Sequence, residues 1–259
     1  KKPEDWKRFF RIVAENDPYG RLRSIHNGIR FYDNSDPLLT HASIQCSAAV
    51  EGPGRASLAR KLVFKPIMMD EVRYEGDIPQ GWGRISAEEE VDRFWFGITQ
   101  GVYVTHGETY DSPDGILWWS HGGTLKGKSP ERIAFLRKYM EESAPRGMPE
   151  PFEIVGDLDY SRIGWKWFAV YFGDNPPETI DPHFWMPGYD RSLRYDLDVV
   201  DAWNMTVDTV RRNVAFVPED GRNSTVYKLE GGPVSIERKP HQAFVIRPAR
   251  AAKEASPEQ

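Results

Sequence analysis

The stretch IMMDEVRYEG, residues 67–76, passes directly from an apolar run into three carboxylates, a guanidinium and a phenol. The apolar run is typical of a buried strand, and a solvated polar loop has no need of such a strand before it. We therefore predict that the strand KPIMMD, residues 65–70, ends in a functional site and positions the polar side chains that follow it.

The composition is that of a globular protein, since 39% of the 259 residues are hydrophobic and 28% are charged. The formal net charge of −5 provides no basic field, which argues against nucleic acid and anionic membranes as partners. No apolar run approaches the roughly 20 residues that span a bilayer. Aromatic residues make up 13% of the chain and include nine tryptophans, which suit both protein cores and the stacking of sugar rings.

Cys46 is the single cysteine, so the sequence excludes an internal disulfide and a thiolate metal cluster, and we expect this thiol in a core. The chain begins with Lys1 and shows no signal peptide, from which we expect that an amino-terminal portion has been removed. A soluble protein of the bacterial cytoplasm and a secreted or periplasmic one both fit these features.

Helices and strands are predicted to alternate over residues 1–148. A helical spacing of apolar residues begins at Trp6, and a capping box of Ser86 and Glu89 begins another helix. Such alternation is typical of parallel strands with crossover helices, in an open doubly wound sheet or in half of an eight-stranded barrel. The predicted strands are 22–27, 41–47, 65–70 and 101–106, and the predicted helices are 3–16, 55–63, 86–99 and one that begins at Ser129.

Residues 149–250 follow a different pattern. After the breaker run SAPRGMPEP, residues 143–151, no helical period is present, and segments such as GWKWFAVYFG alternate or run apolar between turn residues. This pattern is typical of an antiparallel β-sandwich. The polar tail, residues 251–259, is predicted to be disordered.

Polar side chains follow all four predicted strands at the point where each strand ends. Functional groups of parallel α/β folds lie at these carboxyl ends. We therefore expect one pocket to hold them, together with large aromatic residues of the adjoining loops. The strand-end residues are His26, Asn27, Gln45, Asp70, Glu71, His106 and Glu108, and the aromatic residues are Tyr74, Trp82, Tyr110, Trp118 and Trp119.

Carboxylates beside aromatic rings suit glycoside hydrolysis, in which one carboxylate attacks the sugar and another protonates the leaving oxygen. We predict Glu71 as the attacking carboxylate, kept ionised by Arg73 or a nearby tyrosine. The simpler alternative is that Glu71 only forms an ion pair at the rim of the fold. Asp70 is expected to point to the opposite face of the strand and to be structural, because adjacent strand residues alternate. Glu75 is expected either to be structural or to hydrogen-bond the substrate.

No metal and no cofactor are predicted. His26 and His106 lack an HExxH or other tight ligand spacing, so we expect them to bind substrate, to support the carboxylates or to be structural. The chain has no GxSxG elbow and no phosphate-binding loop, and Cys46 has no evident base partner. In the pair Trp118 and Trp119, one ring is expected to stack on a sugar and the other on the core.

Several long strings resemble the apiosidase-like family of glycoside hydrolases: KPIMMDEVRYEGDIPQGWG, RFWFGITQGVYVTHGETY, ILWWSHGGTLKGKSPERIAFLRKYM and, later, YDLDVVDAWNMTV with AFVIRPAR. The resemblance covers nearly all of residues 20–250 and implies a (β/α)8 barrel followed by a β-sandwich. It further implies that the four predicted strands are the last four of the barrel and that Glu71 is the nucleophile at the end of the seventh. The acid/base would end the fourth barrel strand, which this sequence lacks.

The sequence thus predicts an α/β plus all-β protein, with the second half of a (β/α)8 TIM-type barrel in residues 1–148 and a small antiparallel β-sandwich in residues 149–250. The predicted function is a retaining glycosidase of oligosaccharides or polysaccharide side chains, completed by a second polypeptide or a cleaved amino-terminal segment. A homo-oligomer, a noncatalytic carbohydrate-binding subunit and a structural subunit stay open as alternatives. Beside catalytic Glu71, the predicted substrate contacts are His26, Asn27, Gln45, Arg73, Tyr74, Glu75, His106, Glu108, Tyr110, Trp118 and Trp119.

Overall fold

The computed structural model describes residues 2–27, 32–52, 55–111, 124–152, 158–221 and 224–250. The chain divides into two compact units, each with its own hydrophobic core. The predicted domain boundaries, 1–148 and 149–250, stay predictions. The first unit comprises Lys1–Leu136 with Met148–Pro151, and the second comprises Arg137–Gly147 with Phe152–Gln259.

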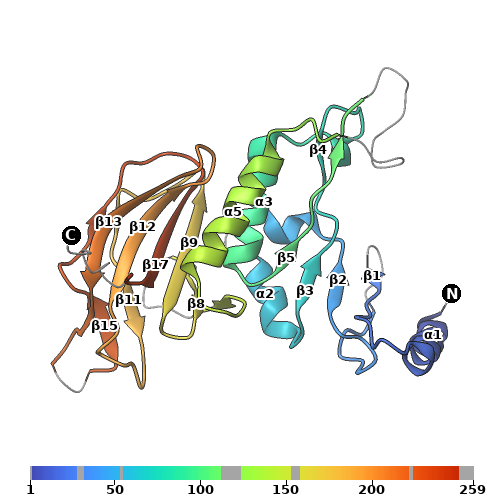
Figure 1. Cartoon of the computed structure of the whole chain (residues 1–259), viewed down its shortest axis with the longest axis horizontal. Coiled ribbons are helices and arrows are strands. Elements are labelled where there is room, and N and C mark those ends of the chain that lie inside the picture. The colour runs from blue at the N-terminus through green and yellow to red at the C-terminus, as the bar shows by residue number, and fades with distance from the viewer. Residues whose placement is uncertain are drawn as a thin grey trace, which may run out of the picture. The chain divides into compact units, whose positions relative to one another are not determined.

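The helices follow the apolar periodicity of the sequence. The hydroxyl of Ser86 accepts a hydrogen bond from the backbone N–H of Glu89 at 3.1 Å, so the predicted cap residue begins α3 (Ala87–Thr99). Phe94 and Trp95 of this helix are buried. The other helices are α1 (Pro3–Asn16), α2 (Arg55–Leu62) and α5 (Ser129–Ser143), and the 3-10 turns are η1 (Ser47–Val50) and η2 (Gly81–Gly83) (Figure 1).

The parallel sheet of the first unit has the order β1-β2-β3-β5. Its strands are β1 (His26–Asn27), β2 (Ala42–Ile44), β3 (Ile67–Met69) and β5 (Tyr103–Val104). The predicted parallel pairing is confirmed, with His26 opposite Ser43 and Met69 opposite both Ile44 and Val104. The residues that follow these strands therefore leave the sheet at the same edge.

A second, smaller parallel sheet follows the first. It pairs β4 (Glu75–Gly76) with β6 (Glu108–Thr109), and Glu75 lies opposite Glu108. A Cβ atom built on Gly76 would lie 2.4 Å from the carbonyl oxygen of Thr109, so only glycine fits at this position. The remaining strand of this unit is β7 (Glu150–Pro151).

The predicted half of a (β/α)8 barrel is wrong. The described part of the chain contains four α-helices, and most of its sheets are antiparallel. Among the described residues, β1 pairs with β2 alone and β5 with β3 alone, so the four-stranded sheet ends at two open edges. Alternation of helices and strands predicts parallel pairing, but closure into a barrel also requires a strand tilt and stagger that alternation does not encode.

The second unit consists of antiparallel sheets, as its alternating pattern predicts. Its larger sheet contains, in spatial order, β13 (Thr206–Val214), β12 (Tyr195–Asp201), β17 (Gln242–Pro248), β9 (Trp167–Gly173) and β8 (Ser161–Ile163). A smaller sheet contains β11 (His183–Trp185), β15 (Val226–Leu229) and β14 (Phe216–Pro218), and β10 (Thr179–Ile180) pairs with β16 (Val234–Ser235).

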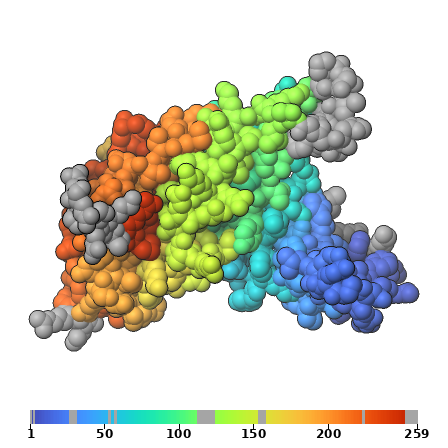
Figure 2. All heavy atoms as spheres, in the orientation of Figure 1, coloured from blue at the N-terminus to red at the C-terminus, as the bar shows by residue number. Residues whose placement is uncertain are grey.

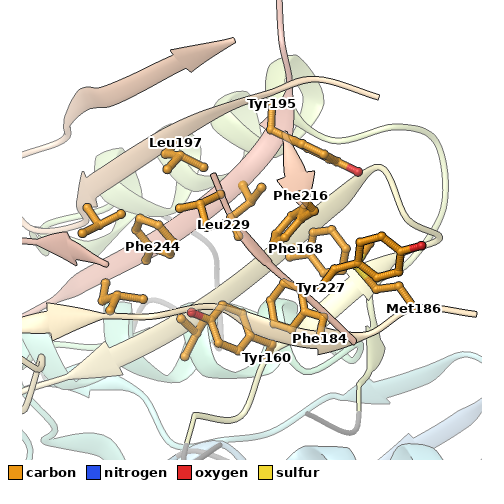
Figure 3. Packing of buried hydrophobic residues seen from close by; sticks show 14 of the residues in the cluster. Tyr160, Phe168, Phe184, Met186, Tyr195, Leu197, Phe216, Tyr227, Leu229 and Phe244 are labelled. Atoms are coloured by element: carbon orange, nitrogen blue, oxygen red, sulfur yellow. The ribbon is translucent and has the colours of Figure 1, made fainter. Parts of the chain in front are cut away.

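Aromatic residues from both sheets fill the core of the second unit (Figure 3). Phe168 of β9 stacks on Phe184 of β11 with ring centroids 4.7 Å apart, and it meets Phe216 of β14 edge-on at 5.8 Å. Such ring pairs stabilise a fold beyond the area that they bury. Because the rings come from different sheets, their packing joins the two sheets into one unit.

A buried ionic network crosses the larger sheet. The guanidinium of Arg247 donates to Asp198 at 2.6 Å and to Asp196 at 2.9 Å, and the phenol of Tyr139 donates to Asp198 at 3.1 Å. Arg247, Asp196 and Asp198 are all buried. A buried charge is tolerated when it is paired and hydrogen-bonded, and this network links the side chains of β12 with that of Arg247 on β17.

Two further predictions concern single features. Cys46 is a free thiol that packs against the core of the first unit, as predicted. The predicted disordered tail, residues 251–259, lies outside the described residues. Within the described part of the chain, no helix is both long and apolar enough to cross a membrane.

Candidate active site

A pocket of about 560 Å³ opens beyond the ends of β2 and β3, and its lining includes Gln45, Glu71, Tyr74 and Trp82. These four residues define what we call the Glu71 pocket. Its volume lies within the range of roughly 300 to 1,000 Å³ that small-molecule sites occupy. The Glu71 side chain is 30% exposed, so its carboxylate is accessible from solvent.

The phenol of Tyr74 is the first polar partner of Glu71. Burial, followed by the charge of Glu71 and a hydrogen bond to it, raises the pKa of Tyr74 to about 12. The phenol is therefore neutral near pH 7 and donates a hydrogen bond to the carboxylate. The ring lies against the backbone of Gly107, where a Cβ atom would come within 2.5 Å of the Tyr74 ring carbons.

The imidazole of His26 lies between two carboxylates. Its Nδ1 atom lies 2.8 Å from Oδ2 of Asp70, and its Nε2 atom lies 3.6 Å from Oε2 of Glu71. The hydrogen bond with Asp70 raises the pKa of His26, against the opposing effect of burial. A protonated His26 places a positive charge beside Glu71.

The expectation that Asp70 points away from Glu71 is wrong. Strand β3 ends at Met69, so the alternation of side chains stops before both carboxylates. Asp70 instead accepts hydrogen bonds from His26 and from the hydroxyl of Ser43 on β2. The structure thus assigns Asp70 a role that sequence reasoning missed, namely to orient the imidazole that contacts Glu71.

Arg73 makes the turn between Glu71 and Tyr74. Its φ angle is 80°, a left-handed conformation that residues other than glycine rarely adopt. The preceding residue, Val72, is fully buried, and its carbonyl oxygen accepts a hydrogen bond from the Arg93 guanidinium at 3.0 Å. The Arg73 side chain is exposed and takes part in none of the ion pairs of the described residues, so Tyr74 and His26 are the groups that act on Glu71.

Glu75 belongs to a separate, buried group. Its carboxylate is 3% exposed and accepts hydrogen bonds from the phenol of Tyr110 at 2.7 Å, from the backbone N–H of Lys128 at 2.9 Å and from that of Ser129 at 3.0 Å. Burial raises the pKa of Glu75, but the hydrogen bonds from Ser129, Tyr110 and Lys128 outweigh it and the net pKa is lowered. Glu75 thus holds the amino-terminal end of α5.

Glu108 and His106 complete this group. Glu108 is fully buried and accepts from the backbone N–H groups of Lys126 at 2.7 Å and Gly127 at 3.0 Å. His106 lies 3.2 Å from the hydroxyl of Ser129 and 3.9 Å from Glu108, and burial lowers its pKa. We call Glu75, His106, Glu108, Tyr110 and Ser129 the buried carboxylate cluster.

The buried carboxylate cluster has the residue types of a metal site. Glu75, His106 and Glu108 offer ligand atoms within 4.8 Å of one another. However, the carboxylate oxygens already accept hydrogen bonds from the backbone of residues 126–129, and a cation would have to displace those donors. The arrangement therefore fits a clamp on the start of α5 better than it fits a metal site.

Glu90 of α3 is a further buried carboxyl group. It is fully buried, and neither of its oxygens has a hydrogen-bond partner among the described residues. Burial raises its pKa well above the ordinary value, and the charge of Arg93 only partly opposes this. The direction follows from burial, because an unpaired buried carboxylate is far less stable than the protonated form.

The structure thus divides the predicted site residues into two groups. Glu71, Gln45, Tyr74 and His26 meet at the Glu71 pocket, whereas Glu75, His106, Glu108 and Tyr110 form the buried carboxylate cluster. Trp118 and Trp119 lie outside the described residues, as does the side chain of Asn27. Sequence reasoning placed Trp82 in a loop but left it out of the site residues, and it did not identify Ser43 or Ser129.

Comparison with solved structures finds a strong likeness. The chain is similar to a putative glycoside hydrolase from Bacteroides vulgatus ATCC 8482, with a TM-score of 0.81 and 31% sequence identity. The match covers 96% of this chain and 49% of that chain, so this chain spans about half the length of that protein. The similarity supports a glycoside hydrolase-like protein. It does not support the predicted apiosidase-like family specifically.

The other comparisons add little. An Anoxybacillus alpha-amylase matches over 97% of this chain and 57% of that chain, at 9% identity and a TM-score of 0.49. No protein-family model matches the chain, and no curated protein matches it.

Proposed function

We propose that this chain contributes to glycoside hydrolysis and that Glu71 is the attacking carboxylate. The observation that carries the proposal is an accessible carboxylate in a small-molecule pocket, hydrogen-bonded by the neutral phenol of Tyr74 and flanked by the Trp82 indole. The similarity to a putative glycoside hydrolase supports it. Predicted contacts from Gln45 and His26 belong to the same proposal.

In the proposed reaction, an oxygen of Glu71 attacks the anomeric carbon and forms a glycosyl ester while the bond from that carbon to the leaving oxygen breaks. The leaving oxygen takes a proton from a second carboxylic acid. Water then attacks the ester, gives up a proton to the same acid and restores Glu71, so that the anomeric configuration is retained. Tyr74 and His26 are the polar side chains that contact the Glu71 carboxylate in the first step.

We propose that the second carboxylic acid comes from a polypeptide or chain segment other than the described residues. Asp70 is the carboxylate next to Glu71, but its Oδ2 atom is bound by His26 and Ser43 and its Oδ1 atom is buried. It is therefore not free to reach the leaving oxygen, which lies on the far side of the scissile bond from a nucleophile.

Turnover of a panel of aryl glycosides tests the function. The assembly of this chain with the proposed second polypeptide or segment should release phenol from at least one substrate, and Glu71→Gln in that assembly should abolish the release while the circular dichroism spectrum stays unchanged. Glu131→Gln is the matched control, because Glu131 is exposed on α5 and pairs only with Arg132 among the described residues. Full activity of Glu71→Gln would remove Glu71 from the mechanism.

A noncatalytic carbohydrate-binding subunit is the second candidate function. It is favoured by one observation, namely that Asp70, the carboxylate next to Glu71, is bound by His26 and Ser43. Such a protein would gain thermal stability on adding a sugar but would release no phenol from any aryl glycoside. The two measurements together separate the candidates.

We propose that the further polypeptide or chain segment packs on the exposed face of α1. Ile12 and Val13 are 45% and 48% exposed, although Phe10 on the same helix is buried, and Figure 2 shows α1 at the surface of its unit. The similar solved structure has about twice the chain length, which supplies an occupant of the required size. A lone 29.8 kDa monomer with full activity, detected by size-exclusion chromatography and mass spectrometry, would contradict this partner.

A further inference from the structure

The indole of Trp82 is exposed although the backbone around it is fixed. Its exposed fraction is 42%, whereas Trp95 of the same unit is buried at 1%. Leaving a large aromatic side chain in water forgoes the stabilisation that its burial would provide. An exposed indole in the lining of a pocket therefore indicates a surface that a ligand covers when it binds.

Hydrogen bonds hold the Trp82 turn from both sides. The carbonyl oxygen of Trp82 accepts from the backbone N–H of Tyr74 at 3.0 Å, and the N–H of Ile85 donates to the carbonyl oxygen of Tyr74 at 3.2 Å. Within the turn, the N–H of Gly83 donates to Gln80 at 2.9 Å. These bonds tie the turn that carries the indole to the segment that carries Tyr74.

The next residue, Gly83, locks the turn against the interior. A Cβ atom at Gly83 would lie 2.5 Å from Cδ1 of Ile78, and the hydroxyl of Thr109 donates to the Gly83 carbonyl oxygen at 2.6 Å. Gly83 and Ile78 are buried. The turn that carries the indole is thus fixed, which lowers the conformational entropy that the site loses when a ligand binds.

We propose that Trp82 is a stacking platform for a neutral sugar ring, and this inference rests on the glycoside chemistry proposed for the Glu71 pocket. The Tyr74 ring is inclined at 80° to the indole, with ring centroids 5.7 Å apart. The indole of Trp82 therefore forms the base of the binding site, and the Tyr74 ring forms one wall. A sugar that presents an unbroken face of C–H groups fits the base. The class of ligand is therefore a glycoside with one apolar ring face.

The polar groups of the pocket complete this geometry. Gln45 is exposed at the lining and offers both a donor and an acceptor to hydroxyl groups at the edge of the stacked ring. Glu71 lies in the same lining, so a ring on Trp82 is held beside the reactive carboxylate. Trp82 is a specificity-determining residue, because stacking requires one apolar face but makes no bond that changes in the reaction.

Binding of methyl glycosides tests the platform without the need for turnover. Dissociation constants are measured by calorimetry for Glu71→Gln alone and for the same protein carrying Trp82→Ala or Trp82→Phe. We expect Trp82→Ala to weaken binding by about tenfold or more, and Trp82→Phe to retain most of the affinity. Trp185→Ala is the matched control, because Trp185 is 54% exposed on β11 of the other unit, and its change should leave the constants unaltered.

The outcomes separate this inference from the proposed function. Turnover by wild type together with equal affinity in Trp82→Ala overturns the platform and leaves the hydrolase intact. Binding that depends on Trp82 without any turnover supports the platform and overturns the hydrolase. If none of the methyl glycosides binds, the platform is overturned as well, and the thermal unfolding of Trp82→Phe shows whether the turn has kept its fold.

Discussion

The Nδ1 atom of His26 lies 2.8 Å from Oδ2 of Asp70, although 44 residues separate them in the sequence. His26 is on β1 and Asp70 follows β3, while Ser43 of the intervening strand β2 donates to the same carboxylate. The ends of three neighbouring parallel strands therefore meet at Asp70. Since His26 also faces Glu71, the electrostatics of the candidate nucleophile depend on this link between strands.

The first prediction concerns the protonation of His26. We expect nuclear magnetic resonance titration to find its pKa above the ordinary value of 6.5, because the hydrogen bond with Asp70 outweighs burial. Asp70→Asn should lower this pKa, since it removes the negative partner. Asp190→Asn in an exposed turn of the second unit is the control and should not move the His26 resonance.

The sign of the accompanying stability change follows from linkage. A histidine whose pKa is raised on folding stabilises the protein at pH values below 6.5, and this contribution is lost as the pH rises through the folded pKa. In Asp70→Asn, the free energy of unfolding should therefore fall less than in wild type as the pH rises from 6.5 through the folded pKa of His26. An unchanged His26 titration in Asp70→Asn would show that the two side chains do not interact in solution.

The second prediction concerns Glu75, which accepts backbone hydrogen bonds at the start of α5. Glu75→Gln replaces an oxygen acceptor by an NH2 donor and leaves buried N–H groups without a partner. We expect a loss of about 3 kcal/mol in the free energy of unfolding, measured in urea. Glu131→Gln on the exposed surface of α5 should change it by less than about 0.5 kcal/mol.

The pH dependence of the same variant provides a second measurement. The pKa of Glu75 is lowered in the folded state, so its stabilisation is present above the ordinary pKa and is lost as the pH falls through the folded value. The acid loss of stability should be smaller in Glu75→Gln than in wild type. Equal acid dependence in both proteins would contradict the clamp assigned to this carboxylate.

Local pattern predicts the strands but not the closure of the sheet. The apolar run before Asp70 marks β3, and the parallel pairing of β3 with β2 and β5 follows from the helices between them. The barrel prediction was wrong because tilt and curvature arise from packing over the whole sheet, which no local pattern encodes. The antiparallel pairing of the second unit was predictable, because short segments that alternate or run apolar are separated there by turn residues and show no helical period.

The candidate site was only partly predictable for a related reason. Sequence reasoning expected every strand-end side chain in one pocket, yet Glu108 lies opposite Glu75 across β4 and β6 and is buried in the interior. The helix-start pattern Ser129-Pro130-Glu131 indicated α5, but not that two distant carboxylates would accept its first N–H groups. Such contacts depend on tertiary placement, as does the exposure of Trp82.

The third prediction concerns the left-handed backbone at Arg73, whose φ angle is 80°. Glycine adopts this angle without strain, so Arg73→Gly should keep activity and stay within about 1 kcal/mol of wild-type stability. Arg73→Val should lose about 2 kcal/mol, because a β-branched residue is strained at positive φ. Thermal unfolding of both variants measures the difference, and equal stability would show that the turn relaxes to another conformation.

The last prediction tests whether the position of the Tyr74 ring controls Glu71. A Cβ atom at Gly107 would lie 2.5 Å from two carbons of this ring, so Gly107→Ala should displace the phenol from the carboxylate while the chain still folds. We expect kcat/KM on the best aryl glycoside to fall by about tenfold to a hundredfold. Gly81→Ala is the matched control, because no atom lies within 4 Å of its Cβ position, and it should keep wild-type activity. In a Tyr74→Phe background the hydrogen bond to Glu71 is already absent, so Gly107→Ala should lower kcat/KM much less than it does in wild type. An equal fall in kcat/KM in the two backgrounds would show that Gly107→Ala does not act through the phenol.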